Sequence, residues 1–517
     1  MAIIDCVPAG DIHPVAGRRN SDPGPTGGFE RISLAAGFRR VVNFCSLNSL
    51  RPSLQPPGAK RDESFSRRDL LFLGLVSAIG FAVGLRGITH YGYIGQDFVF
   101  HRTGILSFAQ SPAFTKADPP GLYWFGTVMR NRVGPAHYLE AIALACLTLN
   151  SAALWVIYGF LWKGISRPPL RYAAAALATF VPFRVIHSVV LASDEFTLPG
   201  FALVAYFTLR LFDNPRSLLS WAGMSLSLSV GLLFKYTFVG LLPPVALLAA
   251  VAIWRRLPEG GRPRWVGIGI LALALPTGFA AFQLIAGTNE NSYHFTRKPW
   301  LPKDLPPAMR WSDILTLQKS DLRLLAAPDY YRGALYGFRS YSYMGLLHVS
   351  SFTDVLECFQ PPAKAPSTDW NQTTVDPIPR DRSPLSQALQ TVAVRWCIVF
   401  SALAIAGTLY CVVLSVVTLL LGRPLLAGAT VVITALATGF FLPILLSLHE
   451  LTNPYVSGYW LPRLILPALL VFFTLGFVMI DSGCPHLGRL RRPLERSLWP
   501  FCAFTLAVCL LFIGFLS

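Results

Sequence analysis

The run DLLFLGLVSAIGFAVGLRGIT, residues 69–89, decides the fold class because it is long and apolar enough to cross a lipid bilayer. About 20 such residues in an α-helix span the ~30 Å hydrocarbon core of a membrane. A helix is suited to that environment because it satisfies its own backbone hydrogen bonds. The run is followed by GQDFVFHR, residues 95–102, which places an acid, a histidine and an arginine just beyond the apolar segment.

The composition of the whole chain agrees with this first segment. Of its 517 residues, 53% are hydrophobic and 14% are charged, and the mean hydropathy is +0.49. A soluble protein would carry roughly 25% charged residues. Further apolar segments lie at residues 136–162, 172–191, 195–212, 217–234, 236–254, 265–286, 391–421, 424–446, 463–481 and 497–516. The sequence therefore predicts an all-α polytopic membrane protein with about 11 transmembrane helices.

The net charge of +17 indicates membrane topology and not nucleic-acid binding, because much of it lies in short loops between apolar segments. Such loops are enriched in lysine and arginine on the cytoplasmic side. The basic loop residues are Lys163, Arg167 and Arg171; Arg210 and Arg216; Arg255, Arg256, Arg262 and Arg264; and Arg489, Arg491, Arg492 and Arg496. All fall on one side if the N-terminus is cytoplasmic. The segments 90–135, 187–194, 287–390 and 447–462 then lie outside.

The chain divides into four parts on this basis. Residues 1–64 are rich in Pro, Gly, Ser and Arg, which predicts a disordered cytoplasmic tail. Residues 65–286 form an N-terminal transmembrane module of about seven spans, and residues 391–517 add about four more. Between them, residues 287–390 form a long extracytoplasmic loop with room for interfacial helices.

Ionisable and other polar side chains that could take part in a reaction gather on the predicted outer side. Ionisable groups at membrane depth cost roughly 2.5–3.5 kcal/mol each on insertion scales, so those that persist there are candidates for function. In chain order they are Asp97, His101 and Arg102; Lys116 and Asp118 in KADPPGLYWFG; Arg184, His187, Asp194 and Glu195; Lys235 and Tyr236; and His449, Glu450, Tyr459 and Arg463. Ordinary alternatives are a solvated loop carboxylate for Asp97, a helix cap for Asp118, and interfacial anchoring for Lys235 and Arg463.

The order of these groups resembles the GT-C superfamily of polyprenyl-phosphate-sugar-dependent glycosyltransferases, which includes protein O-mannosyltransferases and lipid A aminoarabinose transferases. The resemblance extends over residues 69–481. It depends on Asp97 after the first span, on the run DPPGLYW (118–124), on Asp194 at the junction of two spans, and on the run PRLILPAL (462–469). This chain has Asp118 where relatives often carry His or Lys, Phe98 after the first-loop acid where an Asp-Glu pair is common, and Leu464 where Tyr is usual.

The resemblance implies an integral membrane glycosyltransferase of GT-C type. Such an enzyme transfers a hexosyl or pentosyl group, with inversion, from a polyprenyl-phosphate donor to a lipid, glycan or protein acceptor at the extracytoplasmic face. The expected location is the bacterial inner (plasma) membrane. Asp97 is the expected base, because a carboxylate at a membrane surface can be desolvated and made basic. Asp194 is the second catalytic candidate, which would orient the acceptor.

The remaining candidates would contact the donor. Arg463 is the first choice for the leaving phosphate, because a guanidinium group binds phosphate with two parallel hydrogen bonds. Lys235 and Arg184 are the next choices. Asp118, Tyr123 and Tyr459 would bind the sugar or lipid. No dedicated metal motif is present, but Asp97, Asp118 and Asp194 together offer oxygen ligands to a divalent cation.

Three other functions remain open. A secondary transporter or flippase of lipid-linked sugars would show internal repeats and broken helices at mid-membrane. An oligosaccharide ligase or polymerase would be expected to place its essential groups mainly in one large late loop. A non-catalytic relative of the GT-C enzymes is the third alternative.

Overall fold

The computed structural model describes residues 65–91, 98–110, 119–188, 191–286, 310–326, 342–353, 384–422, 425–450 and 462–482, with a few positions between 496 and 508. In this part of the chain every regular element is a helix, and no strand occurs. The predicted all-α membrane fold is therefore confirmed. The predicted tail (1–64) and the candidates Asp97, Asp118 and Tyr459 lie outside the described residues.

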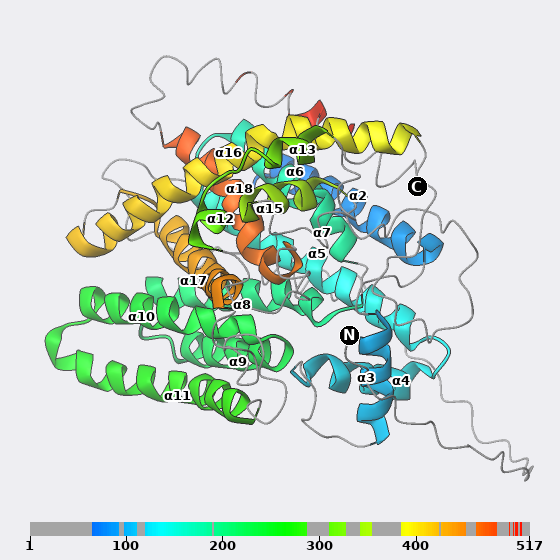
Figure 1. Ribbon diagram of the computed structural model, residues 1–517. Coiled ribbons are helices and arrows are strands. Elements are labelled where there is room, and N and C mark those ends of the chain that lie inside the picture. Colours follow the sequence, from blue (N-terminus) through cyan, green and yellow to red (C-terminus); the bar gives the residue numbers. More distant parts are fainter. Residues whose placement is uncertain are drawn as a thin grey trace, which may run out of the picture. The chain divides into compact units, whose positions relative to one another are not determined.

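The described helices follow one another along the chain in two groups. The first half comprises α2 (Arg67–Tyr91), α3 (Phe98–Gln110), α4 (Gly121–Val133), α5 (Tyr138–Gly164), α6 (Pro168–Phe180), α7 (Pro182–His187), η2 (Ser193–Phe196), α8 (Thr197–Asp213), α9 (Leu218–Phe234), η3 (Tyr236–Leu241), α10 (Leu242–Arg256), η4 (Glu259–Gly261) and α11 (Arg262–Ala286). The second half comprises α12 (Trp311–Leu315), α13 (Asp321–Ala326), α15 (Tyr343–Phe352), α16 (Pro384–Leu421), α17 (Gly428–Glu450), η8 (Pro462–Ile465) and α18 (Leu466–Asp481). In Figure 1, α16 and α18 lie together at the top, and α9, α10 and α11 lie together at the lower left.

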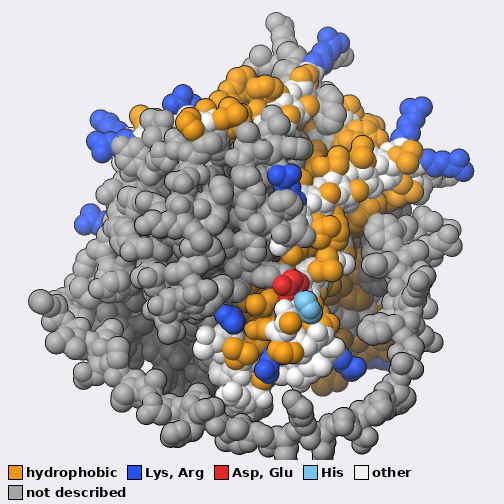
Figure 2. Space-filling model, turned by 90° about the vertical axis from the view of Figure 1, so that its right-hand side faces the viewer, with side chains coloured by type: hydrophobic (Ala, Val, Ile, Leu, Met, Phe, Trp, Pro, Cys, Tyr) orange, Lys and Arg blue, Asp and Glu red, His pale blue; other side chains and the backbone are white. Residues whose placement is uncertain are grey.

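Six helical segments are long and apolar enough to cross a membrane: Arg67–Ile88, Tyr138–Gly164, Tyr236–Arg256, Glu259–Phe282, Ala388–Leu421 and Gly428–Leu446. Leu218–Phe234 and Leu466–Asp481 are shorter apolar helices. Each predicted span up to residue 481 contains a described helix, so the chain is a multi-pass membrane protein. The total of about 11 spans stays a prediction. One face of the molecule carries broad areas of exposed hydrophobic side chains, with Lys and Arg mostly at its margins (Figure 2).

The predicted span 172–191 is not one continuous helix. It divides at Val181 into α6 and the short α7, because Pro182 lacks the N–H that would continue the α-helical hydrogen bonds. The residue before a proline is also pushed out of the helical region, and Val181 has φ −55° and ψ 123°. The division separates Arg184 and His187 from α6 and places them on a short helix of their own.

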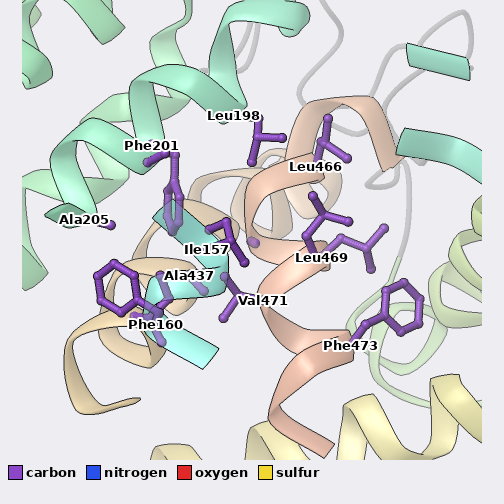
Figure 3. Packing of buried hydrophobic residues seen from close by; sticks show 14 of the residues in the cluster. Ile157, Phe160, Leu198, Phe201, Ala205, Ala437, Leu466, Leu469, Val471 and Phe473 are labelled. Atoms are coloured by element: carbon purple, nitrogen blue, oxygen red, sulfur yellow. The ribbon is translucent and has the colours of Figure 1, made fainter. Parts of the chain in front are cut away.

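The main core lies where α5, α8, α17 and α18 meet. Ile157 and Phe160 of α5 face Phe201 of α8 and Ala437 of α17 in one cluster, and Leu469 of α18 lies beside them (Figure 3). Aromatic rings extend this contact, because Phe440 packs edge-to-face on Phe201 and on Phe238 at centroid distances of 5.8 and 5.5 Å. Helices drawn from both halves of the chain thus share a single core.

The basic loops gather at one end of the helix bundle. Arg256 of α10 lies 3.7 Å from Asp213 at the end of α8. Arg255 donates hydrogen bonds to the carbonyl groups of Thr418 and Leu419, which end α16. Because α8, α10 and α16 all end there, this end is the one that the sequence predicts to be cytoplasmic.

The last described helix is bound to the same end by one carboxylate. Asp481 of α18 accepts hydrogen bonds from the backbone N–H of Ser166 at 2.6 Å, from its hydroxyl at 2.7 Å, and from the N–H of Arg167 at 3.2 Å. These donors lie just before α6, where backbone N–H groups have no partner within the helix and a negative charge is favoured. The carboxylate therefore joins the C-terminal helices to the N-terminal module.

The helices α16 and α18 cross closely where Gly407 faces the backbone of Gly476. We predict that Gly407→Ala lowers the free energy of unfolding by about 1–3 kcal/mol, because its methyl group would meet the Gly476 backbone. Gly74→Ala in α2 is the matched control, since nothing lies within 4 Å of a side chain there. Thermal unfolding of both variants in detergent measures the difference. Equal unfolding temperatures of the Gly407→Ala and Gly74→Ala variants would contradict the close contact between α16 and α18.

Candidate active site

Two adjacent acids, Asp194 and Glu195, lie on η2, a short 3₁₀ helix between α7 and α8. A 3₁₀ helix has three residues per turn, so neighbouring side chains point in different directions. Both acids are buried. Buried carboxylates are retained only when cations or hydrogen-bond donors neutralise them, and each of these two has its own partners.

Asp194 pairs with Lys235, which is the residue that ends α9. The Lys235 Nζ lies 2.8 Å from Asp194 Oδ1, with side-chain exposures of 11% and 4%. The same ammonium group donates to Ser193 Oγ at 3.3 Å. Lys235 reaches η2 because the backbone becomes extended there, with φ −153° and ψ 132°, before η3 begins. An ion pair thus joins two chain segments at the end of the bundle opposite the basic loops.

Glu195 points towards α7 instead. Its Oε1 lies 3.4 Å from His187 Nδ1, and both side chains are 1% exposed. The buried Arg184 guanidinium also interacts electrostatically with this carboxylate. In addition, Asn150 of α5 donates from Nδ2 to the Glu195 carbonyl oxygen at 2.9 Å. Glu195 is therefore held by its side chain and by its backbone.

The start of α4 reaches the same region. A side chain at Gly121 would lie 2.6 Å from the carbonyl oxygen of Leu233, so the PPG run packs directly on the last turn of α9. Phe234, one residue before Lys235, stacks on Phe196 of η2 at a centroid distance of 4.2 Å. Phe125 of α4 packs edge-to-face on Phe196 at 5.3 Å. The start of α4 and the acidic η2 are therefore neighbours.

Tyr123 is buried between α3 and α4. Its ring lies over Gly104, where a side chain would clash with it. The ring of His101 lies 6.2 Å from it. Tyr123 therefore packs the α3–α4 pair together, and this placement favours a structural role over direct contact with a sugar.

The late PRLILPAL run completes the convergence. Its first residues form η8, which packs against η2, α7, α15 and α18. The backbone at position 463 thus lies on an element that contacts those carrying Asp194 and Arg184; the side chain of Arg463 is outside the described part. Runs that the sequence places hundreds of residues apart meet at one end of the bundle.

The loop between α11 and α16 contributes a helix to this end. Every residue from Tyr343 to Phe352 except Met344 is buried, so α15 is not an amphipathic helix lying at the membrane interface. It packs on α7, η8 and α16.

The helix α16 has 38 residues, so it is about 57 Å long and extends beyond a ~30 Å hydrocarbon core.

The proposed metal ligand set stays a prediction, because only Asp194 of its three members lies among the described residues. Among the described residues no group of three His, Cys, Asp or Glu side chains has the arrangement of a metal site. A divalent cation on Asp194 would also have to displace the Lys235 ammonium group at 2.8 Å. Of the proposed ligand set, Asp97 and Asp118 lie outside the described residues.

Comparison with known proteins adds a family to this geometry. Residues 117–278 match the family model described as dolichyl-phosphate-mannose-protein mannosyltransferase. The resemblance to the GT-C superfamily is thereby confirmed for this segment. The matched segment includes Asp118, Tyr123, Arg184, Asp194 and Lys235, whereas Asp97 and Arg463 lie outside it.

A solved structure is also similar. It is the protein O-mannosyltransferase Pmt1-Pmt2 complex of S. cerevisiae bound to the sugar donor. The similarity covers 43% of this chain and 34% of that chain, with 12% sequence identity and a TM-score of 0.37. This chain therefore matches about a third of the yeast protein's length. No curated protein sequence matches.

Two of the predicted site residues, Asp194 and Lys235, form an ion pair in the described structure. Arg184 lies on α7, whose His187 is next to Glu195 of η2. The sequence does not predict the Asp194–Lys235 pair, because it indicates Lys235 and Arg184 for the phosphate and Asp194 for the acceptor. Glu195 and His187 were noted but given no role, and Asn150 was missed. An asparagine within an apolar segment is the signal that would have identified Asn150.

We predict that Asp194→Asn and Lys235→Met each destabilise the protein by roughly 3–5 kcal/mol, because each leaves a buried charge without its partner. The double variant Asp194→Asn/Lys235→Met should lose less free energy of unfolding than the sum of the losses in the two single variants. Thermal unfolding of the three proteins provides the measurement. The exposed pair Glu259–Arg262, 3.5 Å apart, is the control and should show no comparable coupling. Additive losses for Asp194 and Lys235 would contradict the pairing.

The attachment of α15 should depend on pH through His348, which lies outside the candidate spans. Its Nε2 donates to the Val394 carbonyl at 2.9 Å, so Nδ1 accepts from Ser401 Oγ at 2.7 Å. Burial lowers the pKa of His348 from 6.5 to about 4. The neutral ring therefore contributes stability above pH 6.5 that is lost as the pH falls through about 4. Hydrogen exchange in residues 343–352 should rise over this range, and His348→Gln should remove the pH step.

Proposed function

We propose that this protein transfers a sugar from a polyprenyl-phosphate donor to an acceptor at the end of the bundle that carries η2. The observation behind the proposal is the convergence of α4, η2, the Lys235 turn and η8 on one region. The family match over residues 117–278 supports the same class of reaction. The basic loops lie at the opposite end, so we also propose that the N-terminus is cytoplasmic and that the reaction occurs on the extracytoplasmic side.

The reaction needs a base for the acceptor and a cation for the leaving group. The base, Asp97 in this proposal, removes the proton from an acceptor hydroxyl group. The acceptor oxygen then attacks the anomeric carbon, the bond from that carbon to the phosphate oxygen breaks, and the configuration inverts. Positioned proton transfer of this kind contributes about 10²–10⁴-fold in rate.

Lys235 and Arg463 are the proposed ligands of the departing phosphate. Lys235 is 11% exposed at its side chain and already faces an anion, so a phosphate oxygen can take the place of one carboxylate oxygen on its Nζ. When Lys235 turns to the phosphate, Asp194 becomes available to accept a hydrogen bond from the acceptor. Arg184 is 1% exposed and interacts with Glu195, which favours a role inside the protein over contact with the donor.

The transporter alternative is less well supported. Such a protein would place its polar groups at mid-membrane on broken helices. Here the acids of η2 and their cations lie at one end of the bundle, while the contacts among α5, α8, α17 and α18 are apolar (Figure 3). The sugar and the acceptor are the parts of the proposal that need direct assay, with lipid, glycan and peptide acceptors tested in parallel.

We predict that Asp97→Asn lowers the transfer rate about 10²–10⁴-fold, because the variant has no base for the acceptor. The assay follows radiolabelled sugar from a polyprenyl-phosphate donor to the acceptor pool, with the protein in lipid vesicles. Glu140→Gln is the matched control, since Glu140 is an exposed carboxylate at the start of α5 and should keep the full rate.

Arg463→Gln should raise the KM for the donor, and Arg463→Lys should restore part of the lost donor affinity because it keeps the charge.

Transfer by Asp97→Asn at the rate of the unaltered protein would rule out Asp97 as the base. If the unaltered protein transfers no sugar from any polyprenyl-phosphate donor, the proposed function is wrong.

A further inference from the structure

The second acid of η2 has no part in the transfer step, yet it is the more deeply buried carboxylate. Glu195 is 1% exposed and lies against His187, also 1% exposed, at 3.4 Å. Arg184, one turn earlier on α7, is equally buried. We call Arg184, His187 and Glu195 the α7–η2 cluster. Placing three titratable side chains in such an interior is costly unless their charges balance.

The α7–η2 cluster is held from several helices. In α2, Gly80 lies beside the guanidinium group, since a Cβ atom there would be 3.4 Å from Arg184 Nη2, an ordinary contact. In α5, Tyr158 lies near Arg184, and Asn150 donates a hydrogen bond to the Glu195 carbonyl oxygen. Among the described residues, Arg184 Nε and Nη1 have no hydrogen-bond acceptor. The Glu195 carboxylate, on the neighbouring η2, is the anion that attracts this cation.

The cluster is coupled to the proposed site through one peptide bond. Asp194 and Glu195 are consecutive on a single 3₁₀ turn, and the turn is only four residues long. A rotation that moved Glu195 away from α7 would also turn Asp194 away from Lys235. The hydrogen bond from Thr197 Oγ1 to the Asp194 carbonyl, at 2.5 Å, keeps the turn compact, so the two side chains move together.

We propose that Glu195 is a positioning residue for Asp194. Its charge, attracted by Arg184 and His187, fixes η2 in the orientation in which Asp194 meets Lys235. Only the expected change in kcat rests on the proposed function. The expected change in the accessibility of Lys235 can be measured without any transfer activity. A merely space-filling Glu195 would be replaced by glutamine without effect, whereas a charge that positions η2 would not.

The test uses the full-length protein in lipid nanodiscs and four variants. Glu195→Gln removes the charge at nearly constant shape, and Arg184→Gln/Glu195→Gln removes both charges of the pair. Asp194→Asn is the reference for a broken Asp194–Lys235 pair. Glu259→Gln, at a 91% exposed carboxylate in a basic loop, is the matched control. The first readout is the rate at which an amine-reactive ester acylates Lys235, followed by peptide mass spectrometry.

In the unaltered protein Lys235 should react slowly, because it is held by Asp194 and is only 11% exposed. Glu195→Gln should accelerate labelling towards the rate of Asp194→Asn, and the double variant should return it towards the original rate. The second readout is kinetic. Glu195→Gln should lower kcat about 100-fold with the donor KM unchanged, as a displacement of about 1 Å at a reacting group does.

Slow Lys235 labelling in Glu195→Gln would overturn the inference, and so would equally fast labelling in Glu195→Gln and in the double variant. Glu195→Asp keeps the charge on a shorter side chain, so its labelling rate should lie between those of the unaltered protein and Glu195→Gln. This variant preserves the test if Glu195→Gln does not fold. Absence of sugar transfer by the unaltered protein, with the labelling pattern as expected, would reject the proposed function and leave the positioning role intact.

Discussion

The structure depends on a single electrostatic requirement: charges buried at η2 must be neutralised by groups from other helices. Asp194 and Glu195 supply two negative charges, and Lys235 and Arg184 supply two positive ones. Because the interior has a low dielectric constant, removing either member of a pair is more costly than removing both. The end of α9, the short α7 and η2 are therefore fixed relative to one another by charge, and α5 joins them through Asn150.

The two ends of the bundle use ionic groups differently. At the basic end, arginines and Asp481 satisfy helix termini, as in the contacts of Arg255 with α16 and of Asp481 with the residues before α6. These contacts tie helix ends together and leave no charge in the apolar core. At the other end the ionic groups lie on η2, on α7 and at the end of α9, where the backbone departs from a continuous span. Irregular backbone at such depth occurs where protein surrounds it or where it lines a site.

The sequence alone predicts much of this architecture. Length and hydropathy predict the long apolar helices up to residue 481, because a membrane requires about 20 apolar residues per crossing, but they do not predict α3, α4, α12, α13 or α15. Pro182 marks the division of the predicted span 172–191, although hydropathy alone joins α6 to α7. The pairing of Lys235 with Asp194 could not be predicted, since it depends on how α9 packs against η2 and not on spacing along the chain. The burial of α15 likewise depends on tertiary contacts with α7, η8 and α16, which an apolar composition does not specify.

The assignment of Lys235 and Arg184 to different roles follows from their surroundings and not from their charge. Both are cations at the same end of the bundle, and both are equally plausible phosphate ligands from sequence. Lys235 ends a helix, retains 11% exposure and holds an anion by one compact ammonium group that can turn to another acceptor. Arg184 is enclosed by α2, α5 and α7, and its planar guanidinium cannot reach solvent without disrupting the helices around it. A cation that exchanges partners must lie at the boundary of the protein, and a cation that fixes a backbone turn must lie inside it; in the proposal Lys235 is the first kind and Arg184 the second.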